Sequence, residues 1–63
     1  MTLTDLIARE LRMANALTAA EIAARVCAHR EHVLEALREL EDEGRVVMRN
    51  GFYRITEKER AET

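Results

Sequence analysis

Hydrophobic positions in the first quarter of the chain recur at intervals of three and four residues, which is the spacing of one face of an α-helix. This pattern predicts a first helix from Thr4 to Ala14. A threonine before it can cap its N-terminus, and Asp5 places a negative charge in the first turn, where it is favourable. The residues expected on its apolar face are Leu3, Leu6, Ile7, Leu11 and Ala14.

Two further helices are expected in the middle of the chain. The string TAAE at residues 18–21 has the form of a capping box and predicts a second helix over residues 19–26. A third helix is predicted from Arg30 to Glu43, with Gly44 just past its last turn. The connection between them is about four residues long, the length found in helix-turn-helix units. The apolar stripe of the third helix comprises Val33, Ala36, Leu37 and Leu40.

The end of the chain has the pattern of a β-hairpin. Asn50 and Gly51 are the strongest short-range signal for a two-residue type I′ turn. This turn places Val46 opposite Ile55, and side-chain alternation then separates an apolar face from a basic one. The apolar face holds Val46, Met48, Tyr53 and Ile55, and the other face holds Val47, Arg49, Phe52 and Arg54.

The length of 63 residues allows one domain, with 48% apolar residues to build its core. We assign this domain to residues 1–56 and expect residues 57–63 to form a charged, flexible tail. One cysteine cannot form an internal disulfide, which favours a reducing cytoplasm. We expect no membrane segment and no signal peptide, because no apolar run is long enough and the N-terminus lacks a basic stretch followed by an apolar one.

With these elements in order, the chain resembles the winged helix-turn-helix family of small bacterial, phage and plasmid DNA-binding transcriptional regulators. The resemblance implies a mainly α fold with a small β-hairpin: three helices plus a two- or three-stranded antiparallel wing. The segment that carries it is LTAAEIAARVCAHREHVLEALRELEDEGRVVMRNGFYRIT, residues 17–56. The matched positions are Thr18, Ile22, Ala23, Val33, Leu37, Leu40, Gly44, Val46 and the hairpin from Asn50 to Ile55.

The resemblance implies sequence-specific binding of double-stranded DNA, with the third helix in the major groove and the wing on the adjacent backbone. Arginine suits such contacts because its planar fork pairs with phosphate or guanine. A homodimer or a regulatory protein partner would add affinity, and Leu34, which lies off the core stripe, could pack under the wing or support self-association. The expected DNA-binding residues are Arg25, His29, Arg30, Glu31, His32, Glu35, Arg38, Arg49 and Arg54.

Two features of the chain depart from the family pattern. The turn carries Cys27 where glycine is frequent, and His29 stands at the cap position before the third helix. The third helix is also acidic, with Glu31, Glu35 and Glu39, and the net charge of the chain is −2. A carboxylate can still accept a hydrogen bond from cytosine. The alternative is a winged-helix protein-interaction adaptor that does not bind DNA.

Catalytic or metal chemistry is not expected. Cys27, His29 and His32 are possible zinc or iron ligands, but they lack a fourth partner, and the cysteine lies in the turn before the helix. The only glycines, Gly44 and Gly51, serve local backbone needs rather than a phosphate-binding loop. No combination of nucleophile, base and orienting group is present, so we predict neither an enzyme nor a cofactor.

Overall fold

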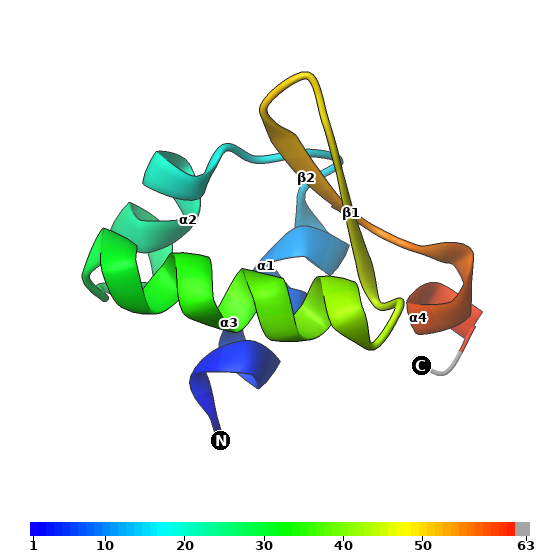
Figure 1. The fold of residues 1–63 in the computed structure, drawn as a ribbon, viewed down its shortest axis with the longest axis horizontal. Helices are drawn as coiled ribbons and strands as arrows, with labels where there is room; N and C mark the ends of the chain where they lie inside the picture. The colour runs from blue at the N-terminus through cyan, green and yellow to red at the C-terminus, as the bar shows by residue number, and fades with distance from the viewer. Residues whose placement is uncertain (62–63) are drawn as a thin grey trace.

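The computed structural model describes residues 1–61. Figure 1 shows α3 crossing in front of α1, and α2 lies beside the N-terminal end of α3. The hairpin follows the C-terminal end of α3, and α4 lies near the base of the hairpin. In chain order the elements are α1 (Leu3–Met13), α2 (Ala19–Val26), α3 (Arg30–Asp42), β1 (Val46–Arg49), β2 (Phe52–Ile55) and α4 (Glu57–Ala61).

Local capping signals determine where the first two helices begin. The Thr2 hydroxyl accepts from the backbone N–H of Asp5 at 3.2 Å, and the Asp5 carboxylate accepts from the N–H of Thr2 at 3.3 Å. The helix α1 therefore starts one residue earlier than predicted. The same reciprocal pair joins Thr18 and Glu21, at 3.2 and 2.9 Å, and α2 has the predicted bounds. Each pair satisfies N–H groups that have no partner within the helix.

The three longer helices pack their apolar faces around one core, which the hairpin closes. Within residues 1–61, no helix is both long and apolar enough to cross a membrane. The third helix contributes the stripe that was predicted from its spacing, and all of its members are buried. The core comprises Ile7, Leu11, Leu17, Ile22, Val33, Ala36, Leu37, Leu40, Val46 and Ile55.

The hairpin has the predicted register, with Val46 opposite Ile55 and Arg49 opposite Phe52. Both turn residues adopt positive φ, 54° at Asn50 and 84° at Gly51, as a type I′ turn requires. Met48 lies on the predicted apolar face of the hairpin, but it is 51% exposed and does not join the core. Met48 lies nearer the turn than Val46, and the core does not extend that far along the strands.

Leu17 pairs with the edge of β2 that does not face β1. The N–H of Leu17 donates to the Tyr53 carbonyl at 3.1 Å, and the N–H of Tyr53 donates back at 2.7 Å. This isolated antiparallel bridge joins the α1–α2 connection to the wing. Because the bridge uses backbone groups on the outer edge of β2, it holds the hairpin against the helices.

The segment after the wing differs from the flexible tail expected over residues 57–63. Residues 57–61 form α4, while residues 62 and 63 lie outside the described part of the chain. The Thr56 hydroxyl accepts from the N–H of Glu59 at 3.3 Å and donates to the Gly44 carbonyl at 2.7 Å. Glu59 is only 2% exposed, because its carboxylate lies between two arginines. An ionic contact, rather than apolar packing, therefore holds this short helix.

Candidate nucleic-acid interface

A groove separates the N-terminal half of α3 from the wing. On α3 its walls are formed by Arg30 and Leu34, which lie one helical turn apart. The wing contributes side chains from both strands, and the N-terminus of α2 closes one end. The residues that line the groove are Thr18, Ala19, Ala20, Arg30, Leu34, Met48, Gly51 and Tyr53.

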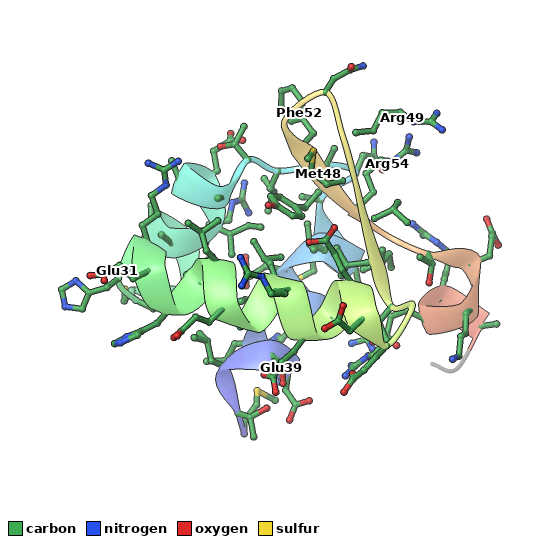
Figure 2. All side chains as sticks on the ribbon, viewed as in Figure 1. Glu31, Glu39, Met48, Arg49, Phe52 and Arg54 are labelled. Atoms are coloured by element: carbon green, nitrogen blue, oxygen red, sulfur yellow. The ribbon has the colours of Figure 1, made fainter. Side chains whose placement is uncertain are left out.

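The predicted site residues of α3 divide between two flanks of that helix. Arg30 faces the groove beside the wing. His32 and Glu35 line a second hollow, between α3 and the N-terminus of α1, together with Glu39. In Figure 2, Glu39 accordingly projects from the side of α3 opposite the wing, and Glu31 lies at the N-terminal end of the helix. The flank of α3 that faces the wing is therefore less acidic than the helix as a whole.

Four of the predicted arginines have exposed side chains that no carboxylate of residues 1–61 neutralises. Within residues 1–61, Arg30, Arg38, Arg49 and Arg54 form no ion pair. Arg49 and Arg54 share one face of the wing, since Arg49 pairs with Phe52 and Arg54 with Val47 in the ladder. Figure 2 shows both guanidinium groups on the same side of the hairpin. These groups are available to an external anion.

Arg25 differs from the other predicted arginines. It lies in the last turn of α2, as expected, but its guanidinium contacts the Glu10 carboxylate of α1 at 3.5 Å. Both side chains are partly exposed to solvent, at 48% and 23%. An exposed ion pair of this kind is weak, so the contact can be exchanged for another anion at small cost.

The turn between α2 and α3 contains Cys27 and His29, the two residues that depart from the family pattern at this point. Cys27 adopts the left-handed conformation, with φ 55° and ψ 45°, which glycine occupies more readily. His29 is the N-cap of α3, yet its side chain makes no capping hydrogen bond. The rings of His29 and His32 meet edge to face with centroids 5.9 Å apart. Among residues 1–61, no group of three potential ligands is placed to hold a metal ion.

Sequence reasoning missed several residues of the groove, chiefly Thr18, Ala19 and Ala20 at the start of α2. Their capping box was visible, but nothing local indicates that the start of α2 lies beside the wing. Met48 and Tyr53 were assigned to the apolar face of the hairpin, and both also line the groove. Met48 is exposed, whereas Tyr53 is partly buried and also packs against the core.

Solved structures similar to this chain include two of the Mycobacterium tuberculosis MarR-family protein Rv2887. The complex of Rv2887 with DNA matches at a TM-score of 0.88 and 28% identity, over 97% of this chain and 48% of that one. A second Rv2887 structure matches at a TM-score of 0.84 and 29% identity, over 97% and 47%. PigF, solved with SAH, matches at a TM-score of 0.76 and 30% identity, over 94% of this chain and 18% of that one.

No family model and no curated protein matches the sequence. The element order, the hairpin and the structural matches nevertheless define the class: the chain is a winged helix-turn-helix domain. The similar solved structures include a protein of the MarR family, and the chain spans about half the length of Rv2887. The fold predicted from the resemblance is confirmed.

Proposed function

We propose that this chain binds double-stranded DNA as the DNA-binding domain of a transcriptional regulator. In this proposal α3 enters the major groove, and the wing contacts the adjacent backbone. Binding is sequence-specific, because α3 presents side chains to the edges of the bases. The observation that carries the proposal is the match to Rv2887 in its complex with DNA, which extends over 97% of the chain.

The free arginines support this assignment. Arg30 on α3 and the pair Arg49 and Arg54 on the wing belong to the two elements that would meet DNA. Because none of them has a carboxylate partner within residues 1–61, a phosphate would not have to displace an internal ion pair. Their guanidinium forks can bind phosphate oxygens or guanine in a bidentate manner. Arg25, His29, Glu31 and Arg38 are the remaining proposed contacts, whereas the predicted residues His32 and Glu35 line the hollow between α3 and α1.

The net charge of −2 indicates that such binding is weak for a single domain. We therefore propose that the protein acts as a homodimer or with a regulatory protein partner, in a bacterial cytoplasm. Two domains related by a two-fold axis would read half-sites about 34 Å apart, one turn of the duplex. This spacing would give the operator an inverted repeat.

The salt dependence of DNA binding tests the proposal. Fluorescence anisotropy with a labelled mixed-sequence duplex would give Kd at about 50 mM and about 200 mM salt. Four phosphate contacts predict about a 100-fold loss of affinity between these two conditions. Arg49→Ala and Arg54→Ala should each weaken binding and lower the slope of log K against log salt by about one.

Arg9→Ala serves as the matched control, because Arg9 is an exposed arginine of α1 that does not line the groove. It should leave both the affinity and the slope nearly unchanged. Equal effects of the α1 and wing substitutions would contradict the assigned interface. Absence of binding at the lower salt concentration would contradict DNA binding altogether.

The second candidate is a protein-interaction adaptor with the same fold. The hollow between α3 and α1 favours it, because Glu35 and Glu39 line that hollow and both are exposed. A basic partner segment would bind there, away from the wing. Glu35→Gln together with Glu39→Gln would then weaken partner binding, whereas the same pair of substitutions should strengthen DNA binding by removing negative charge.

A further inference from the structure

We propose that Leu34 is a base-reading residue that contacts the methyl group of a thymine next to the base pair read by Arg30. The inference rests on the proposed function, and it names a feature of the DNA sequence that this groove would select. Leu34 is 39% exposed, although it belongs to a helix whose core stripe is fully buried. Its side chain is therefore not committed to the core.

The position of Leu34 couples it to Arg30. The two residues are four apart in α3, so they lie on the same flank, and both line the groove beside the wing. Four residues correspond to about 6 Å along a helix axis. Base pairs are spaced at about 3.4 Å, so the two side chains can reach base pairs one or two steps apart.

The chemistry of the major groove selects the ligand. Guanine presents two acceptors that match an arginine fork, while the C5 methyl of thymine is the apolar group that bases expose there. An isobutyl side chain has no hydrogen-bonding group, so it can discriminate between bases only through apolar contact. The pair Arg30 and Leu34 thus favours a guanine with a thymine one or two base pairs away.

Self-association through Leu34 is the competing explanation for its exposure, and the neighbouring charge disfavours it. In a symmetric contact centred on Leu34, the Arg30 side chains of both copies would approach each other. Within residues 1–61, neither would have a carboxylate of its own chain to offset the repulsion. The phosphates that border a DNA groove, by contrast, would offset the positive charge of Arg30.

Replacement of thymine by deoxyuridine provides a direct test, because it removes only the methyl group. Duplexes would first be selected from a random library by the complete chain, and each thymine of the selected site would then be replaced in turn. One substitution, near a guanine, should weaken binding of the unmodified protein about fourfold, the effect of losing one buried methyl-sized group. Leu34→Ala should bind the thymine duplex about as weakly, with no further loss on the deoxyuridine duplex.

Met13→Ala is the matched control, since Met13 is an apolar side chain of α1 that is 72% exposed. It should retain the full sensitivity to deoxyuridine. Circular dichroism would verify that both variants are folded. Selected sites that respond to no deoxyuridine, or Leu34→Ala that keeps the fourfold response, would overturn the inference while leaving DNA binding intact. Failure of the library to yield any bound duplex would instead overturn the proposed function with it.

Discussion

The guanidinium of Arg12 donates a hydrogen bond to the carboxylate of Glu59 at 2.7 Å and thereby joins residues 47 positions apart in the chain. Arg45, which precedes β1, binds the same carboxylate through Nη2 at 2.8 Å and through Nε at 3.1 Å. Glu59 therefore connects α4 to α1 and to the base of the wing. The position of the hairpin relative to the helices depends in part on this contact.

Substitution of Glu59 tests the energetic weight of the contact. Glu59→Gln removes the charge that two arginine side chains share, which are 33% and 25% exposed, although Arg45 retains its contact with the Glu43 carboxylate at 3.4 Å. We expect a loss of about 1–3 kcal/mol in the free energy of unfolding, below the value for fully buried pairs because both arginines reach solvent. Urea unfolding would measure it. Glu57→Gln on the exposed side of α4 should change stability by less than about 0.5 kcal/mol, and equal losses would refute the proposed role of Glu59.

The same carboxylate should make stability depend on acid. The hydrogen bond from Arg45, aided by the charge of Arg12, holds the pKa of Glu59 below its ordinary value of 4.5. Stability from this group is therefore fully present above about pH 4.5 and is lost as the pH falls through the lowered pKa. Thermal unfolding at a series of pH values should show a shallower acid decline for Glu59→Gln than for the unmodified protein.

Asp5 also has a pKa below its ordinary value, because its carboxylate accepts a hydrogen bond from the backbone N–H of Thr2. Asp5→Asn thus provides the control for the pH experiment. If Asp5→Asn abolished the acid decline and Glu59→Gln did not, the capping box rather than the arginine cluster would be responsible.

Replacement of Cys27 by glycine should stabilise the fold. The left-handed conformation at φ 55° costs a residue with a Cβ atom about 1–2 kcal/mol. Glycine would remove this cost, but its greater conformational freedom in the unfolded chain offsets part of the stabilisation. We expect a net gain of about 0.5–1 kcal/mol for Cys27→Gly in urea unfolding. Cys27→Ala keeps the Cβ atom and should show no gain, so similar values for the two variants would count against backbone strain at this turn.

A better cap at the start of α3 should also raise stability. The His29 side chain makes no capping hydrogen bond, so a free N–H group of the first turn lacks the partner that serine would supply. His29→Ser is expected to gain about 0.5–1 kcal/mol, measured as a rise in Tm. The same replacement at His32, inside the first turn, should give no gain because that position cannot cap the helix. A gain at His32 but not at His29 would disprove the capping argument.

Several features were predictable because their signals act over a few residues. The capping box at Thr18 and Glu21 and the Asn50–Gly51 turn produced the expected helix start and strand register. The helix α4 could have been found in the same way, since Thr56 and Glu59 repeat the threonine–glutamate spacing of a capping box. The charged composition of residues 57–63 favoured a solvated tail instead. The two arginines that bind Glu59 are distant in the chain, so no local pattern indicated that its carboxylate would be buried.

The amino-acid sequence alone was sufficient to predict α1, α2 and α3, the hairpin turn and the pairing of the strands. These depend on backbone hydrogen bonds and on periodicities of two and 3.6 residues, which any short segment displays. Packing alone decided that Arg30 and Leu34 face the wing, that Glu35 faces α1, and that Glu59 meets Arg12. Those contacts depend on the angles at which separate elements cross, and the angles follow from how the whole core fills its volume.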